Sequence, residues 1–275
     1  MKTSNHLLRR LTAALLAAVL ALSIALPVFA SDDGDTIYIN SVSDLLSLAK
    51  SCAYDQWSVG KTVILQKDLS LEGMLWEPIP SFSGQFKGNG HTISDLTITG
   101  QYSPAGLFGI VEEQGSIESL SVRGIVSVSD SADTTTGGIV GINHGTLINC
   151  QFTGVVTGDS EVGGIVGRNE SEGTIDHSTA RAIVTGKSST GGIAGYNLGA
   201  ITGCTNVGSI NTEYQEASLD TDGFTAKMVD QINNKIAAAD DDATNSVTNV
   251  ATDTGGIAGR SSGMILTSVN TGTVG

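Results

Sequence analysis

The sequence predicts an all-β protein, a parallel β-helix in which short strands stack coil upon coil. Three observations carry this prediction. A glycine-rich pentapeptide recurs along the chain, branched aliphatic residues recur at fixed distances behind it, and glycine or small polar residues separate the aliphatic stretches. Repeats of this length are typical of solenoids, in which each unit buries its apolar face against its neighbours. We expect right-handed coiling, the rule for parallel crossover connections.

The first element is an export segment, residues 1–30. It starts with basic residues, continues as the apolar run Leu11 to Leu26, and ends in Pro-Val-Phe-Ala. We interpret it as a signal peptide cleaved after Ala30, because small residues stand at positions −3 and −1 of that cut. An uncleaved membrane anchor is the alternative, but the run is shorter than the ~20 residues of a spanning helix. The sequence thus predicts a secreted, extracellular chain with no membrane insertion after cleavage.

The charge of the remaining chain limits its partners. Cleavage removes three positive charges and leaves 11 Lys and Arg against 28 Asp and Glu, a net charge of −17. Nucleic acids and anionic lipids attract proteins through Lys and Arg, so neither is an expected partner. We interpret the acidity as solubility outside the cell.

Residues 31–104 are expected to form an N-terminal cap and the first strands. A helix is predicted from Ser41 to Cys52, with Ser41 as its N-cap. Such a helix would cover the open end of the first coil, where unpaired strand edges invite aggregation. The apolar face of this helix is predicted at Leu45, Leu48, Ala49 and Cys52. Strands are predicted around it at residues 36–39, 63–65 and 92–99.

The repeats are predicted over residues 105–275. Copies of the pentapeptide begin 26 to 32 residues apart, with one interval of 64, and each repeat is expected to hold three short strands ending in glycine or a small polar residue. Equivalent residues of successive coils would lie ~4.8 Å apart in inward ladders. The three ladders are Ile139, Ile165, Ile193 and Ile257; Ile117, Leu147, Ile175, Ile201 and Ile265; and Val126, Val156, Val184, Ile210 and Val274.

Two other series recur at fixed repeat positions. Asn143, Asn169 and Asn197 are expected at corners, in the left-handed backbone region, with hydrogen bonds along the stack. Cys150 and Cys204 share one position two coils apart, ~9.6 Å by the strand spacing. Because disulfide Cα atoms rarely exceed ~6.8 Å, we expect buried thiols in an inward ladder rather than a disulfide.

Two other repeat folds fit the sequence less well. Leucine-rich repeats need an L-x-x-L-x-L-x-x-N pattern that is absent, and propeller blades run ~40 residues or more.

The repeat starting at Gly137 resembles the GLUG motif, roughly G-G-I-V-G-x-N-x-G-x-I-x-N-C-x-x-x-G-x-V. The copies at Gly163 and Gly191 also match, with Ser178 in place of cysteine in the former, whereas the copy at Gly255 departs at Ser261 and Ser268. With a similar lead-in over residues 82–99, the resemblance covers about residues 36–212 and 252–275.

The resemblance implies a bacterial exported or surface protein. GLUG repeats occur in large surface proteins, including adhesin-like ones, and in the non-catalytic N-terminal regions of some IgA-cleaving metallopeptidases. The repeat has no assigned catalytic residues, so the resemblance implies none here.

Two segments depart from the repeat. Residues 213–253 form an insertion with a predicted helix, Thr225 to Ala239, interpreted as a surface excursion or, alternatively, a binding loop. The final coil has no predicted cap, and we therefore expect the chain to be the N-terminal part of a longer protein.

We predict no catalytic, cofactor-binding or metal-binding residue. The histidines His91, His144 and His177 form no H-E-x-x-H motif. Calcium has weak support, since residues 32–35 and 220–223 are incomplete ligand sets. Trp57 and Trp76 are expected to pack in the cap, with a sugar-binding platform as the alternative.

An enzyme is the principal alternative, because parallel β-helices also form polysaccharide lyases and hydrolases. That chemistry needs clustered carboxylates. The candidate carboxylates lie in turns around two coils and are Asp159, Glu161, Glu170, Glu172 and Asp176. The sequence shows no pattern of Lys or Arg beside them.

The sequence thus favours a non-catalytic, extracellular structural or adhesive module. Its expected partners are glycans or surface proteins of a host or cell wall. The alternatives are a polysaccharide-active β-helix enzyme and the non-catalytic N-terminal region of a surface metallopeptidase.

Overall fold

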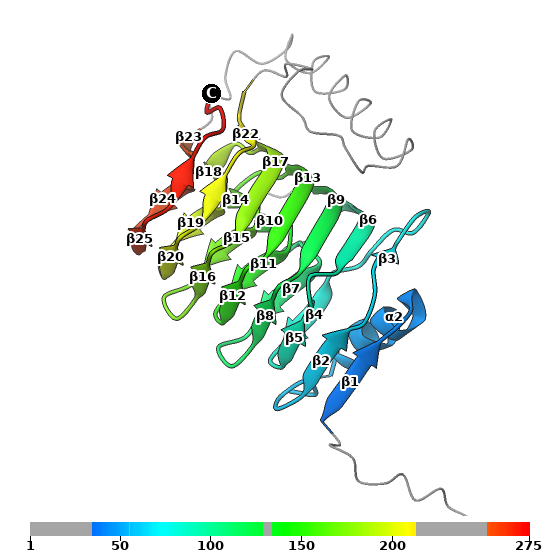
Figure 1. Ribbon diagram of the computed structural model, residues 1–275. Helices are drawn as coiled ribbons and strands as arrows, with labels where there is room; N and C mark the ends of the chain where they lie inside the picture. Colours follow the sequence, from blue (N-terminus) through cyan, green and yellow to red (C-terminus); the bar gives the residue numbers. More distant parts are fainter. Residues whose placement is uncertain (1–34, 55, 129–133, 213–251) are drawn as a thin grey trace, which may run out of the picture. The chain divides into compact units, whose positions relative to one another are not determined.

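The chain folds as a parallel β-solenoid, as predicted (Figure 1). The computed structural model describes residues 35–54, 56–128, 134–212 and 252–275. The expected signal peptide and the expected helix at 225–239 lie outside these residues. Residues 36–275 form one compact unit, and the strand pairs of its described part are parallel. Successive strands of each sheet come from successive coils.

Two eight-stranded sheets form two sides of the coils. Sheet A consists of β1 (Thr36–Ile39), β2 (Thr62–Leu65), β5 (Gln85–Lys87), β8 (Ser116–Glu118), β12 (Thr146–Ile148), β16 (Thr174–Asp176), β20 (Ala200–Thr202) and β25 (Met264–Leu266). Sheet B consists of β3 (Leu69–Ser70), β6 (Thr92–Gly100), β9 (Ser121–Val128), β13 (Gln151–Thr157), β17 (Thr179–Thr185), β21 (Thr205–Asn206), β22 (Ser209–Ile210) and β26 (Val269–Asn270).

Two smaller sheets complete the coils. Sheet C consists of β4 (Ile79–Phe82), β7 (Phe108–Val111), β11 (Val140–Asn143), β15 (Val166–Asn169), β19 (Ala194–Asn197) and β24 (Ala258–Ser261). Sheet D consists of β10 (Thr136–Gly137), β14 (Val162–Gly163), β18 (Ser188–Gly191) and β23 (Thr252–Gly255).

The three predicted aliphatic ladders are confirmed. Backbone hydrogen bonds link Ile139, Ile165, Ile193 and Ile257 in turn, and the other two ladders follow the register of sheets A and B. In the inner coils these side chains are fully buried. The solenoid core is therefore a stack of equivalent aliphatic residues.

Sheet D corrects the prediction of three strands per repeat. Each of its strands ends at the first glycine of the Gly-Gly pair, and two or three residues pair with the next coil before the chain continues into sheet C. A second correction concerns the glycines expected to end a strand. Gly124 and Gly154 lie inside β9 and β13, opposite each other. A Cβ at Gly154, whose φ is +149°, would collide with the Gly124 carbonyl, so glycine keeps the two strands at pairing distance.

The predicted cap helix is confirmed as α2 (Val42–Ser51). The Ser41 hydroxyl accepts the Asp44 amide at its N-terminus, and the Asp44 carboxylate accepts the Asn40 amide. The Ser41 hydroxyl thus satisfies one of the amides that a helix start leaves open, and the Asp44 carboxylate ties the residue before the N-cap to the first turn. The helix contacts β1 and β4 and buries Leu45 and Leu48 against the first coils.

The predicted conformation of the asparagine series is wrong, although its hydrogen bonding is confirmed. Asn143, Asn169 and Asn197 end strands of sheet C and are fully buried. Each amide nitrogen donates to the next coil, at 2.8 Å from Asn143 to Asn169 and from Asn169 to Asn197. The left-handed corner lies in a different column, four residues after the next repeat glycine, at Ser119, Asn149, His177, Gly203 and Thr267.

The cysteine column is confirmed as buried thiols. Cys150 and Cys204 are free and buried, and Ser178 lies between them in the stack. The Cys150 amide donates to the Ser178 hydroxyl at 3.1 Å, and the Ser178 amide donates to the Cys204 sulfur at 3.4 Å. The Cys204 amide in turn donates to the Ser268 hydroxyl. Each side chain therefore satisfies a backbone amide of the preceding coil.

Candidate functional site

The carboxylates singled out in the sequence are brought together in part. Glu161 and Glu170 both bind Arg168, at 2.9 and 2.6 Å. Burial alone would lower the pKa of Arg168, but attraction and hydrogen bonds from the two carboxylates raise it overall. The other three candidates stay apart from this group. Asp159 pairs with Lys187 at 2.6 Å, Asp176 pairs with the exposed His177, and Glu172 accepts the Ser171 hydroxyl, which lowers the Glu172 pKa.

Cations accompany three of these carboxylates, although the sequence shows no pattern of Lys or Arg beside them. Lys187 reaches Asp159 from the next coil, whereas Arg168 lies only seven and two residues from Glu161 and Glu170.

Arg168 also follows Ile142 in a column on the outer face of sheet C, where Tyr196 and Arg260 come next in register. The two guanidinium groups lie 5.2 and 5.3 Å from the centre of the Tyr196 ring. Arg168, Tyr196 and Arg260 each stand five residues after the first glycine of their pentapeptide. This shared spacing could have indicated the column from the sequence.

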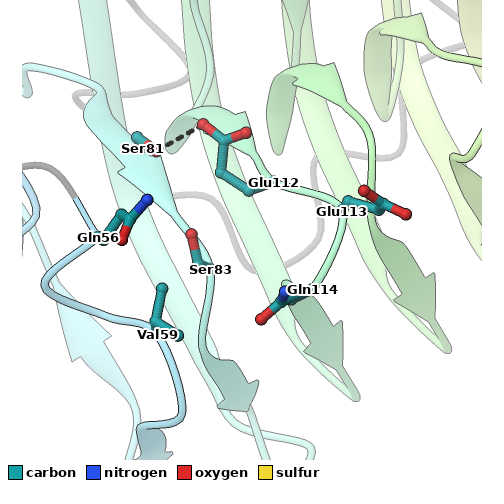
Figure 2. A pocket seen from close by; sticks show the side chains of 7 residues that line it. All are labelled: Gln56, Val59, Ser81, Ser83, Glu112, Glu113 and Gln114. Carbon is teal, nitrogen blue, oxygen red and sulfur yellow. Dashed lines mark hydrogen bonds between the residues drawn. The ribbon is translucent and has the colours of Figure 1, made fainter.

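A polar cleft of about 330 Å³ lies beside the early strands of sheet C (Figure 2). It is formed where the turn that follows α2 meets the ends of β4 and β7. The amide of Ser83 donates to the Ser58 hydroxyl at 2.8 Å and so ties that turn to β4. The lining residues are Gln56, Val59, Ser81, Ser83, Glu112, Glu113 and Gln114.

The cleft offers hydrogen-bonding groups rather than an apolar surface. The Ser81 hydroxyl donates to the Glu112 carboxylate at 2.7 Å. In Figure 2 the Glu112 carboxylate lies toward Ser81, whereas the Glu113 carboxylate points away from it. Hydroxyl, amide and carboxylate groups of this kind bind polyols, whose hydroxyls both donate and accept hydrogen bonds. Sequence reasoning missed this cleft because its members come from three different turns.

A second hollow, of about 380 Å³, lies at the start of sheet B. Next to it the buried Asp95 accepts hydroxyls from Ser70 and Ser94, at 2.6 and 2.9 Å. Asp68, on its rim, accepts the Thr92 amide at 2.9 Å and lies 3.1 Å from the His91 ring. The hydrogen bond donated by the Thr92 amide is the main cause of the lowered pKa of Asp68.

Both tryptophans pack in the cap region, as predicted. Trp76 is buried, and its indole nitrogen donates to the Leu107 carbonyl at 3.1 Å. Trp57 is partly buried against the core, and the Lys61 ammonium lies 5.3 Å from its ring centre. One indole is therefore enclosed, and the other already has a cation over its ring.

The described residues contain neither a candidate metal-binding group nor a candidate membrane-spanning helix. They contain no group of three or more His, Cys, Asp or Glu side chains arranged to hold a metal ion. The candidate calcium loop at 220–223 lies outside them. Within the same part of the chain, no helix has both the length and the apolar character that crossing a membrane needs.

The comparisons with known proteins confirm the GLUG resemblance. Residues 158–185, which run from the end of β13 through β17, match the family described as the GLUG motif. Halomucin of Haloquadratum walsbyi is 32% identical over 155 residues, and a protein of Evansella cellulosilytica named as a Gly-rich membrane protein is 29% identical over 137 residues. These matches cover 52% and 36% of this chain, but only 2% and 16% of the two relatives.

One solved structure resembles the fold. It is a protein of Bacteroides ovatus named as an immunoglobulin A1 protease, with a TM-score of 0.48 and 20% sequence identity. The match covers 64% of this chain and 59% of that protein.

Proposed function

We propose that this chain is a non-catalytic extracellular module, a structural and adhesive solenoid that binds glycans through the cleft around Ser81 and Glu112. The observation that supports the non-catalytic part of the proposal is that three carboxylates on the surface are engaged in ion pairs. Glu161 and Glu170 share Arg168, and Asp159 is paired with Lys187. Glycoside hydrolysis needs one carboxyl that can donate a proton and a second that attacks or activates water, whereas these three carboxylates are each engaged in an ion pair with Arg168 or Lys187.

The comparisons support the location and character of the module. The GLUG motif at 158–185 and the likeness to halomucin and to a Gly-rich membrane protein favour a surface or secreted protein. Since the chain spans only a small share of both relatives, we infer from them no activity for the whole protein.

Binding of the purified chain to immobilised cell-wall polysaccharides and mucin glycans tests the proposal. We expect retention that weakens about tenfold or more in Glu112→Ala, as the loss of a hydrogen bond to a charged group predicts. Glu77→Ala, which removes an exposed carboxylate outside the cleft, is the matched control and should bind like the unaltered chain.

The catalytic alternative has its own readout. If incubation with the chain lowers the viscosity of a polysaccharide solution, the module is an enzyme and the proposal is wrong. Asp176→Asn and Glu172→Gln would then show whether those two carboxylates are responsible.

A further inference from the structure

The cleft around Ser81 is negatively charged. Two of the residues that line it are acidic, Glu112 and Glu113, and none of the lining residues is basic. Lys61 closes the turn that follows α2, but it does not line the cleft, and its ammonium lies 5.3 Å from the centre of the Trp57 ring. Because complementary charge governs which partners a site accepts, the cleft disfavours ligands that carry carboxylate or sulfate groups and favours ligands with a positive charge.

The side chains that line the cleft also call for a ligand with hydrogen-bond donors. The Ser81 hydroxyl has one proton and gives it to the Glu112 carboxylate at 2.7 Å, so its oxygen meets a ligand as an acceptor. Ionised carboxylates only accept hydrogen bonds. The donors left among the lining side chains are the amides of Gln56 and Gln114 and the hydroxyl of Ser83.

A protonated amine attached to a sugar ring has the required chemistry. The amine carries one positive charge and three donors and has no acceptor, and its hydrogen bonds to carboxylates are roughly twice as strong as those between neutral groups. The ring hydroxyls both donate and accept, which suits the amides and the Ser83 hydroxyl. Val59, which is 43% exposed, offers an apolar contact to the carbon face of the ring.

We propose that the cleft binds the free amino group of an amino sugar, with Glu112 as the partner of its charge. In Figure 2 the Glu112 carboxylate lies toward Ser81, whereas Glu113 points away and adds attraction from the rim. The inference rests on the glycan-binding function proposed above and narrows it to sugars whose amine is not acetylated. A lysine side chain of a protein fits less well, because its apolar stem leaves the neutral polar groups of the cleft without partners.

Two oligosaccharides that differ in acetylation test the inference. One is a chitosan hexasaccharide, whose amines are free, and the other is the chitin hexasaccharide of the same length, whose amines are acetylated. Titration calorimetry with the purified chain at about pH 6, where an amine carries its proton, measures both affinities. We expect the free amine to bind about tenfold or more tightly, and we expect added salt to reduce this preference.

A pair of matched variants separates the cleft from the general negative charge of the chain, which is −14 by sequence. Glu112→Gln keeps the shape of the side chain and removes its charge, so the preference for the free amine should fall about tenfold. Glu77→Gln removes the same charge from an exposed position outside the cleft and should leave the preference unchanged.

The outcomes separate this inference from the proposed function. If the acetylated sugar binds as tightly as the free amine, or if the two variants change the preference equally, the inference is wrong while glycan binding stands. A hexalysine peptide that binds more tightly than the chitosan hexasaccharide would assign the cleft to protein amines and would also overturn it. If neither sugar binds, the inference is wrong, and the proposed function falls with it only where immobilised polysaccharides and mucin glycans also fail to retain the chain.

Discussion

At the scale of single residues, the coils from Cys150 onward are held together by side chains that repeat one bonding pattern. Ser178 and Cys204 each accept a backbone amide of the coil before, and each donates to the carbonyl two residues earlier in its own coil. Oxygen and sulfur alternate in this column because both can make the same two bonds. The position therefore selects for a small side chain with a donor and an acceptor.

This column predicts that Ser178→Ala destabilises the fold whereas Ser178→Cys does not. Alanine leaves the buried Cys150 amide without its acceptor, which costs about 1–3 kcal/mol of the free energy of unfolding. Cysteine keeps an acceptor in the position, as Cys204 does one coil on. Urea denaturation of the three proteins measures the difference, and equal losses in the two variants would contradict the role assigned to the hydroxyl.

At the scale of elements, the coils were predictable from the sequence where a side-chain pattern reports on burial. The aliphatic ladders and the glycine spacing indicated the stacked strands, and the Ser41 and Asp44 pair indicated the cap helix. Sheet D could not be predicted in this way, because two residues such as Thr136 and Gly137 are too few to show a period.

The candidate site was less predictable than the fold. The Asp159 and Lys187 contact and the cleft at Ser81 join residues of different coils, so both depend on how the coils stack. The asparagine series shows a different limit. Its sequence indicated a repeated hydrogen bond correctly, but asparagine is common both at left-handed corners and in buried amide ladders. Only the register of sheet C distinguishes the two.

For the elements of sheet C we predict that Asn169→Ala weakens the stack more than an outward substitution on a neighbouring strand. The change leaves the Asn143 amide nitrogen with the Gly145 carbonyl as its one remaining acceptor, and it removes the Asn169 donor from the Asn197 amide oxygen. Loss of a buried hydrogen-bond partner costs about 1–3 kcal/mol. Thr174→Ala, on the outer face of β16, is the control, and thermal melting of both variants is the measurement. Similar melting temperatures would show that the ladder adds little to stability.

At the scale of the whole molecule, the core contains ionisable groups that are stable only in their neutral form. Burial raises the pKa of Cys150 to about 12, and those of Cys52 and Cys204 to about 11, from an ordinary value of 9.0. In the folded chain these thiols keep their protons over a range of pH in which the unfolded chain has lost them. The unfolded state therefore binds fewer protons there, and stability falls as pH rises.

We accordingly predict that the contribution of the thiols to the free energy of unfolding is constant below pH 9.0 and declines from there toward the raised values. Denaturation curves at a series of pH values measure this. A variant with serine at positions 52, 150 and 204 removes the thiols and should flatten the decline. If that variant keeps the full slope, other groups cause it.

The repeated contacts between coils also have a consequence for how such a protein evolves. The coils that carry Asn143, Asn169 and Asn197 present to one another the same side-chain amide of sheet C, the same hydroxyl or thiol column, and equivalent aliphatic side chains, so the junctions between them are interchangeable. The repeats differ in length, yet Val140, Val166 and Ala194 remain in register, because the extra residues fall in turns. Unequal recombination between repeats can therefore add or delete a whole coil without disturbing its neighbours, and the length of the solenoid becomes a heritable trait that can change in single steps.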